Sequence, residues 1–422
     1  MTSYVPRLID RELTDLLGDF AAVMVVGPRA GGKTTSASRV SRTIVRLDRE
    51  LEAVPVAADP DTVLAELEAP ILLDEWQLVP SVLPAVKRQV DLDARAGRFL
   101  LTGSVRADLL EPTWAATGRV VTLAQWGLTE RELRRRIDLP PLLDELFDGA
   151  GATLASPAEP PNLKDYVELA LRGTFPDVAR RAGERSRRIW WDGYIHQLIT
   201  RDASLADEHR DPAKLRRYLT ALAANNAGVV EHKTLYDAAG VNRRTADAYD
   251  ALFELLFALD RVPAWHNNRL NRITRTDKRY LVDPAMAASM LGLDLRSVLR
   301  NGDILGRLLD SFVLSQLRPE AAIAASHPRF HHLRLDGGSR EIDLLAEARN
   351  GQVVAIECKA TASPGQRDAR HLAWLRDRIG DQFSAGVVFH TGPRVVQLGD
   401  RLHALPIASI WDRGETTPGR SG

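Results

Sequence analysis

The chain has 422 residues, of which 45% are hydrophobic, enough for the cores of about two to four domains. Lysine plus arginine balances aspartate plus glutamate, 56 each, so the net charge indicates no class of partner. The single cysteine, Cys358, excludes an intrachain disulfide and a zinc site with several cysteines, and indicates a reducing compartment. The first residues, MTSYVPRLIDRE, lack the apolar segment of a secretory signal, and no apolar run approaches a membrane span. We therefore expect a cytoplasmic protein with no membrane partner.

Lysine is scarce among the basic residues, with 7 Lys against 49 Arg. An ammonium group is a compact point charge, whereas a guanidinium group is a planar fork. The need for a point charge is therefore one candidate reason for a lysine in this chain. Two of the seven, Lys33 and Lys359, lie inside candidate motifs.

A glycine-rich loop follows the first predicted strand, AVMVV at residues 22–26. It matches the spacing Gly, four residues, Gly, Lys, then Ser or Thr. Glycines let backbone N–H groups turn toward an anion, and the N-terminus of the following helix attracts phosphate. The lysine would reach the β- and γ-phosphates, and the hydroxyl of Thr34 would bind Mg²⁺. We predict an ATP site formed by Gly27, Pro28, Arg29, Ala30, Gly31, Gly32, Lys33, Thr34 and Thr35.

Two later strands are predicted to supply polar residues to this site. The run ILLDE at residues 71–75 ends in Asp74 and Glu75, as the second core strand of a P-loop ATPase does. Asp74 would order the Mg²⁺ ion, and Glu75 would polarise the attacking water. In an AAA-type core the strand in RFLLTGS, residues 98–104, lies between the other two and carries a sensor of the γ-phosphate. Thr102 and Ser104 are the candidates, and an ordinary strand followed by a turn is the alternative.

Arg119 precedes another apolar strand, in the segment TGRVVTLAQWGLTERE. An arginine at this place either acts as a finger on the nucleotide of a neighbouring subunit or is an ordinary surface residue. The first interpretation would imply a ring or filament of copies of this chain. The predicted catalytic residues are thus Glu75, Lys33 and Arg119, with ATP and Mg²⁺ as cofactors.

The order of these motifs resembles prokaryotic AAA-type ATPases that carry a C-terminal domain of unknown function, number 4143. The segments that carry the resemblance are GPRAGGKTT, ILLDEWQLVP, FLLTGS and GRVVTLAQWGLTERE. LRGTFPDV at residues 171–178 and RRIWWDGYIHQLITRDAS at residues 187–204 agree with it. The resemblance covers nearly the whole chain. It implies an AAA-type ATPase core and leaves the physiological role open.

The middle of the chain contains a helix-turn-helix pattern. After the ATPase domain, residues 1–147, a Gly-, Ala-, Ser- and Pro-rich linker is predicted at 148–163, followed by a helical region at 164–300. One helix ends at Gly240, and a second runs to Asp260 and is followed by a basic wing. The first turn of the second helix would enter the major groove of DNA, through Asn242, Arg243, Arg244 and Thr245. Residues 180–280 hold 19 Lys and Arg against 13 Asp and Glu, a net charge of +6 that agrees with phosphate attraction. Winged-helix folds also serve as protein-docking modules and as lids on ATPase cores.

Residues 301–412 are predicted to form an α/β domain, followed by a disordered tail at 413–422. Two strands, REIDLLAEA and QVVAIECKA, flank an Asn-Gly turn, a strong hairpin pattern. Asp343 lies on the first strand, and Glu357 and Lys359 share one face of the second. This order resembles the restriction-endonuclease-like fold, in which Asp343 and Glu357 would hold Mg²⁺ and Lys359 would activate water. Asp310 on the preceding helix is a further candidate ligand, and the fold also occurs without cleavage.

The expected fold class is α/β multidomain: a P-loop AAA-type ATPase core, a helical winged-helix middle and an α/β restriction-endonuclease-like C-terminal domain. Three hypotheses for the function follow. One is an ATP-dependent enzyme acting on DNA. Another is a nucleotide-switched DNA-binding regulator without cleavage, and the third is a toxin-like or protein-docking ATPase. DNA and further copies of the chain are therefore the candidate partners.

Overall fold

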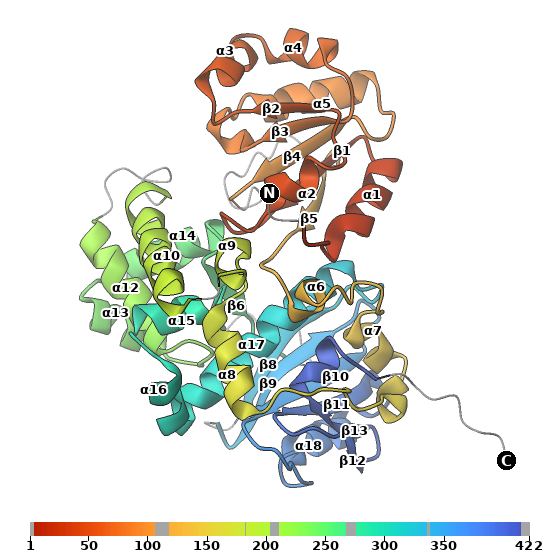
Figure 1. The fold of residues 1–422 in the computed structure, drawn as a ribbon, viewed down its shortest axis with the longest axis vertical. Helices are drawn as coiled ribbons and strands as arrows, with labels where there is room; N and C mark the ends of the chain where they lie inside the picture. Colours follow the sequence, from red (N-terminus) through yellow and green to blue (C-terminus); the bar gives the residue numbers. More distant parts are fainter. Residues whose placement is uncertain are drawn as a thin grey trace, which may run out of the picture. The chain divides into compact units, whose positions relative to one another are not determined.

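The computed structural model describes residues 4–105, 118–181, 183–202, 211–266, 276–335 and 338–414 (Figure 1). The predicted wing loop between residues 267 and 275 and residues 415–422 of the predicted tail lie outside the described residues. The prediction that the disordered tail begins at Arg413 is wrong, because this side chain is buried and donates to the Pro140 carbonyl at 2.7 Å. The chain divides into two compact units. The first comprises Met1–Leu128, Phe175–Asp177 and Asp250–Ala258, and the second comprises Thr129–Thr174, Val178–Tyr249 and Leu259–Gly422. Among the described residues, no helix combines the length and the apolarity needed to cross a membrane.

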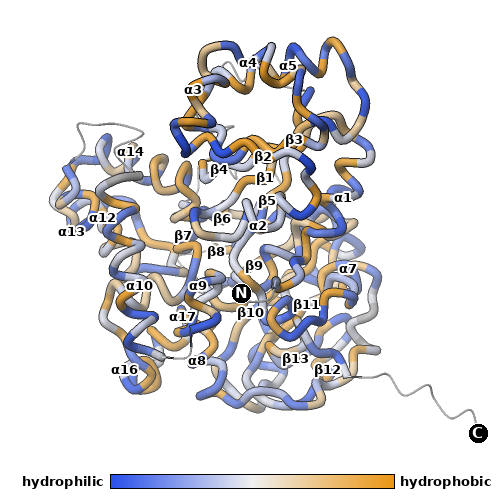
Figure 2. The backbone as a smooth tube through the Cα atoms, turned by 45° about the horizontal axis from the view of Figure 1, so that its top comes forward, coloured by the Kyte–Doolittle hydropathy of each residue, from blue (hydrophilic) through white to orange (hydrophobic). Residues whose placement is uncertain are grey.

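A parallel five-stranded sheet forms the centre of the first unit, with the order β2-β3-β4-β1-β5. Its strands are β1 (Ala22–Val26), β2 (Thr43–Arg46), β3 (Ile71–Asp74), β4 (Phe99–Gly103) and β5 (Val121–Ala124). Every residue of β1, β3 and β4 is buried, as expected for central strands of a parallel sheet. Figure 2 shows the hydrophobic colour along β1. The prediction that the third strand lies between the other two is confirmed, because β4 pairs with both β3 and β1.

Several helices accompany this sheet among the described residues of the first unit. They are α1 (Ile9–Asp19), α2 (Lys33–Ala37), α3 (Glu50–Ala58), α4 (Pro60–Glu66) and α5 (Val82–Leu92). The carboxyl ends of β1, β3 and β4 meet at one edge of the sheet, where open α/β sheets bind ligands. Helix α2 begins directly after the loop at the end of β1, so the predicted strand, loop and helix are present.

A mixed six-stranded sheet with the order β12-β13-β11-β10-β9-β8 forms the second unit's core. Its strands are β8 (Arg329–Leu335), β9 (Arg340–Glu347), β10 (Val353–Lys359), β11 (Phe383–His390), β12 (Val396–Gly399) and β13 (Leu402–Pro406). The predicted hairpin is confirmed, since β9 and β10 pair antiparallel. Alternate residues of β10 point to opposite faces of the sheet. Val354 packs in the core that includes α17 (Gly302–Ile323), and Val353 packs in the core that includes α18 (Arg370–Ile379).

Further helices belong to the second unit. They are α6 (Glu130–Leu133), α7 (Leu142–Phe147), α8 (Leu163–Arg172), α10 (Glu184–Gln197), α12 (Pro212–Ala224), α13 (His232–Ala239), α15 (Pro284–Met290) and α16 (Leu295–Arg300). The predicted helix end at Gly240 is confirmed, because Gly240 caps α13, and the structure shows this glycine in the left-handed conformation.

The second helix of the predicted helix-turn-helix, α14 (Arg243–Leu255), is shorter than expected. The prediction that it reaches Asp260 is wrong. Leu259 and Asp260 instead begin strand β6 (Leu259–Val262), which pairs antiparallel with β7 (Lys278–Leu281). Phe257, with a φ of 54°, lies in the turn between helix and strand. Strand pairing with residues some twenty positions later thus overrides the helical pattern.

Candidate functional site

The loop between β1 and α2 requires glycine at both ends. A Cβ atom on Gly27 would lie 1.9 Å from the carbonyl oxygen of Gln125, so only glycine fits this close approach. Gly32 has a φ of 91°, in the left-handed region, immediately before the first residue of α2. Between them lie the other predicted loop residues, Pro28, Arg29, Ala30 and Gly31, and Thr35 follows on the exposed side of α2.

Two buried side chains fix the loop from outside the motif. The Gly31 carbonyl accepts hydrogen bonds from Arg7 Nη1 at 2.9 Å and from Gln125 Nε2 at 3.2 Å. Arg7 also donates to the carbonyls of Trp126, at 2.6 Å, and Gly127, at 3.1 Å. The sequence pattern does not reveal Arg7 or Gln125, because they lie 24 and 94 residues from Gly31. Together they hold the loop against the N-terminal segment and the chain after β5.

Lys33 lies across the loop with its side chain buried. Its Nζ donates to the carbonyl oxygens of Gly27, at 3.0 Å, and Pro28, at 2.9 Å. Burial lowers the pKa of Lys33 to about 8, although the carboxylates of Glu75 and Asp74 act to raise it. The ammonium group is thus held close to the position that phosphates would occupy. The two carboxylates do not fully offset the effect of burial, so the pKa of Lys33 stays below its ordinary value.

The two predicted Mg²⁺ ligands meet next to this lysine. The hydroxyl of Thr34 donates to Asp74 Oδ1 at 2.7 Å, and the hydroxyl of Thr102 donates to the same oxygen at 2.5 Å. Asp74 is buried at the end of β3. Carboxylate and hydroxyl oxygens are the ligands that Mg²⁺ prefers, so Thr34 and Asp74 fit that ion.

Glu75 follows Asp74 with a φ of 57° and a ψ of 48°, a left-handed conformation that is uncommon outside glycine. Its Oε2 accepts a hydrogen bond from Ser104 Oγ at 3.1 Å and another from Gln77 Nε2. Gln77 Nε2 also donates to Ser104 Oγ at 3.2 Å. The predicted base and the predicted sensor therefore belong to one hydrogen-bonded group, to which the structure adds Gln77.

Arg119 has a partner within its own chain. Its Nε lies 2.5 Å from Asp91 Oδ1, and its side chain is about half exposed, at 45%. The hydrogen bond from this arginine lowers the pKa of Asp91. A role for Arg119 on a neighbouring subunit stays a prediction, and it would require this ion pair to open.

The second unit brings together the other predicted set of ionisable residues. Asp310 comes from α17, Asp343 from β9, and Glu357 and Lys359 from β10. Lys359 Nζ donates to Glu357 Oε1 at 2.5 Å. Lys278 on β7, which the sequence pattern leaves out, lies among them, with its Nζ 2.5 Å from Asp310 Oδ2 and 3.2 Å from Asp343 Oδ1. We call Asp310, Asp343 and Glu357 the carboxylate centre.

Burial and neighbouring charges shift the pKa values in this centre. Burial raises the pKa of Glu357 to about 8, and the nearby Asp343 adds to this effect. Burial also raises the pKa of Asp310 to about 6, while Lys278 opposes the rise. Burial alone would lower the pKa of Lys278, but the carboxylates of Asp310 and Asp343 outweigh it and hold this pKa well above its ordinary value. Lys278 is therefore charged at neutral pH.

The residues predicted to face DNA lie at the start of α14. Asn242 Oδ1 accepts a hydrogen bond from the backbone N–H of Thr245 at 2.9 Å, so Asn242 caps the helix. Arg243 and Arg244 are exposed on the first turn. Arg243 Nε also lies 3.9 Å from Asp247 Oδ2 in an ion pair whose two side chains are exposed.

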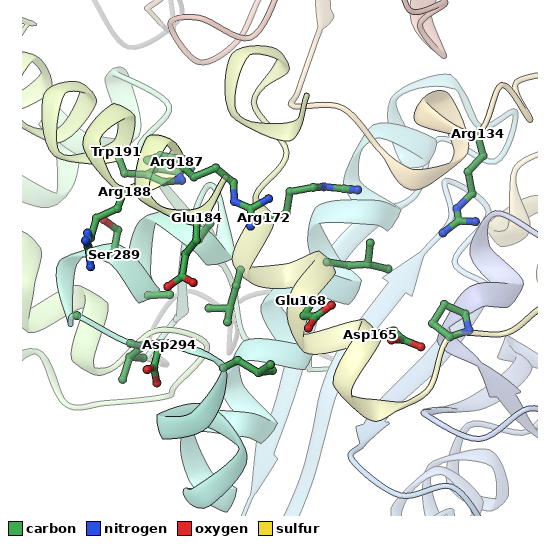
Figure 3. A pocket seen from close by; sticks show the side chains of 18 of the residues that line it. Arg134, Asp165, Glu168, Arg172, Glu184, Arg187, Arg188, Trp191, Ser289 and Asp294 are labelled. Atoms are coloured by element: carbon green, nitrogen blue, oxygen red, sulfur yellow. The ribbon is translucent and has the colours of Figure 1, made fainter. Parts of the chain in front are cut away.

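A separate cavity of about 900 Å³ lies within the second unit. Its walls carry basic side chains, such as Arg172 and Arg187, together with acidic ones, such as Glu168 and Glu184 (Figure 3). Because the two signs of charge are mixed, the lining indicates no single class of ligand.

Comparison with known proteins confirms the resemblance to AAA-type ATPases with a C-terminal domain of unknown function. An AAA domain matches residues 19–134, and two domains of unknown function match residues 163–297 (DUF8612) and 305–410 (DUF4143). Uncharacterized proteins of Mycobacterium tuberculosis and Mycobacterium bovis are each 28% identical over 397 residues, which is 93% of this chain and 81% of theirs. The Walker-type ATPase PABY2304 of Pyrococcus abyssi is 12% identical, with a TM-score of 0.40, over 67% of this chain and 94% of that one. The restriction-endonuclease-like ending stays a prediction.

Proposed function

We propose that this chain, with its AAA domain, binds ATP with Mg²⁺ in the first unit and hydrolyses it. The observation that carries the proposal is the meeting of Lys33, Thr34 and Asp74 at the end of β1 and β3, where Thr34 and Asp74 are joined at 2.7 Å. A buried ammonium beside a glycine-dependent loop suits the terminal phosphates. The hydroxyl and carboxylate oxygens suit the metal ion that accompanies them.

Each residue of the site has a distinct part in this chemistry. Mg²⁺, when bound, neutralises charge on the β- and γ-phosphates. Lys33 would exchange its bonds to the Gly27 and Pro28 carbonyls for bonds to phosphate oxygens. Glu75 would orient the attacking water and accept its proton, and Ser104, which donates to the Glu75 carboxylate, would hold that group in place. The test is steady-state ATP hydrolysis by the wild-type and Glu75→Gln chains, with and without Mg²⁺.

ATP affinity is expected to be level at lower pH and to fall by about tenfold per pH unit well above the pKa of Lys33, which is about 8 in the free protein. Phosphates favour the ammonium form, so binding above this pH requires uptake of a proton. Below it, Lys33 is already protonated and no such cost arises. The measurement is ATP titration by calorimetry across this range, in two buffers with different heats of ionisation.

Lys33→Arg is the matched control for this pH dependence. A guanidinium group stays charged throughout this pH range. Whatever its absolute ATP affinity, the variant should therefore show no fall in affinity as the pH rises. An equal fall in the variant would assign the pH dependence to another group.

A second candidate function is DNA binding through the first turn of α14. The observation in its favour is the exposure of Arg243 and Arg244 at the start of a helix that follows α13 and the turn at Gly240. In a helix-turn-helix protein this turn lies in the major groove. A protein-docking role for the same surface is the alternative.

Replacing Arg243 and Arg244 together with alanine is expected to weaken DNA binding and to reduce its dependence on salt concentration. If each arginine neutralises a phosphate, the slope of log affinity against log salt should fall by about two. Fluorescence anisotropy with a labelled duplex at several salt concentrations gives this slope. Arg296→Ala with Arg300→Ala, two exposed arginines of α16, makes the same change in charge elsewhere. Equal effects of the two double variants, or no binding by the wild type, would favour the docking role.

A further inference from the structure

The carboxylate centre of the second unit contains a cation supplied by the chain itself. Lys278 Nζ contacts three oxygens, Asp310 Oδ2 at 2.5 Å, Asp343 Oδ1 at 3.2 Å and the Asp343 carbonyl oxygen at 3.4 Å. The Lys278 side chain is only 2% exposed, so water does not compete for these contacts. The ammonium group therefore occupies the space between the carboxylates of α17 and β9.

Further hydrogen bonds use the oxygens that a metal ion would need. Tyr280 OH donates to both carboxylate oxygens of Asp310, at 3.2 and 3.1 Å. The second oxygen of Asp343 accepts the backbone N–H of Cys358 at 3.1 Å. One carboxylate oxygen of Glu357 accepts a hydrogen bond from Lys359, and the other has no hydrogen-bond partner among the described residues.

A divalent metal ion does not fit this arrangement. It would need carboxylate oxygens from Asp310, Asp343 and Glu357 at about 2.0 to 2.6 Å from one point. In the described part of the chain, no three His, Cys, Asp or Glu side chains are placed to hold a metal ion. Candidate ligands are present, but the ammonium of Lys278 occupies the point where Asp310 and Asp343 converge.

We propose that Lys278 is the resident cation of the carboxylate centre and takes the place of the divalent metal that its Asp and Glu-x-Lys pattern would otherwise bind. The centre then joins β7 to α17 and β9 as an ionic clamp and does not cleave nucleic acid through a metal. The scarcity of lysine agrees, because this position keeps one of only 7 lysines in a chain with 49 arginines. A compact ammonium matches the space of an ion, whereas a planar guanidinium does not.

The first test compares Mn²⁺ binding by the wild-type and Glu357→Gln chains without nucleotide. Electron paramagnetic resonance of free Mn²⁺ gives the number of ions bound per chain. Glutamine keeps the size of the side chain and an oxygen for Lys359, but it removes the carboxylate with the unpartnered oxygen. The two chains are expected to bind the same number of ions. A bound ion that is present in the wild type and lost in Glu357→Gln would overturn the proposal.

The second test removes the resident cation. Lys278→Met is expected to gain about one Mn²⁺ per chain, because Asp310 and Asp343 are then left without their ammonium and Glu357 keeps an oxygen without a hydrogen-bond partner among the described residues. The gain should be absent when Glu357→Gln is added. Lys233→Met, which removes an exposed lysine of α13, should bind as the wild type does. A folded Lys278→Met chain that gains no ion would overturn the proposal, and the first test decides alone if this variant fails to fold.

Discussion

Replacing Glu75 with glutamine is expected to lower ATP hydrolysis by about 10² to 10³-fold while ATP still binds. Glutamine has the size of glutamate but cannot accept a proton from water at neutral pH. Its side-chain oxygen can still accept the hydrogen bond that Ser104 Oγ now donates to Glu75 Oε2 at 3.1 Å, so the local structure should survive. Phosphate release at saturating ATP, together with a separate ATP titration, distinguishes lost chemistry from lost binding.

The matched control is Glu66→Gln, an exposed glutamate at the end of α4 in the same unit. It makes the same chemical change away from the phosphate loop and should leave the rate unchanged. If Glu75→Gln hydrolyses ATP as fast as the wild type, the water is activated by another group. If neither the variants nor the wild type hydrolyse ATP, the loop is a switching or structural nucleotide site, and the proposed mechanism is wrong.

The grouping of the residues of the proposed nucleotide site was largely predictable, because it is encoded locally. The loop, Lys33 and Thr34 follow one strand without a gap, and Asp74 and Glu75 directly follow another. Parallel strands bring their carboxyl ends to one edge of the sheet, so two strand-end motifs suffice to place these residues together. The β9–β10 hairpin was predictable for a similar reason, because the Asn350-Gly351 turn fixes how its strands pair.

The features that the sequence did not predict depend on contacts between residues that are far apart in the chain. Arg7 and Gln125 reach the glycine-rich loop only through tertiary structure. Lys278 is separated by 32 residues from Asp310 and by 65 from Asp343. The apolar end of α14 was assigned to a longer helix because periodicity does not show that Leu259 pairs with Leu281. The scarcity of lysine was the one available indication of Lys278, but it does not say which residues surround it.

The segment that follows the first unit is fixed in the second by a buried ion pair. Arg131 of α6 and Glu320 of α17 lie 2.5 Å apart, and each side chain is 1% exposed. Glu320 also accepts the backbone N–H of Leu142 at 2.9 Å. Burial raises the pKa of Glu320, while Arg131 and Arg413 oppose the rise. A buried ion pair generally contributes little net stability, because desolvation offsets the attraction between its charges, although removal of one partner has a large cost.

Glu320→Gln is accordingly expected to destabilise the second unit by about 3 to 5 kcal/mol, because it leaves the Arg131 charge buried and uncompensated. Urea unfolding is followed by circular dichroism, and the change in the free energy of unfolding is taken from the transition assigned to the second unit. Glu168→Gln, which breaks an exposed ion pair with Lys164 on α8, should change stability little. The double variant Arg131→Met with Glu320→Met should recover most of the loss, since it removes both buried charges at once. A double variant that is as unstable as Glu320→Gln would show that hydrogen bonds to the backbone, and not the unpaired charge, set the cost.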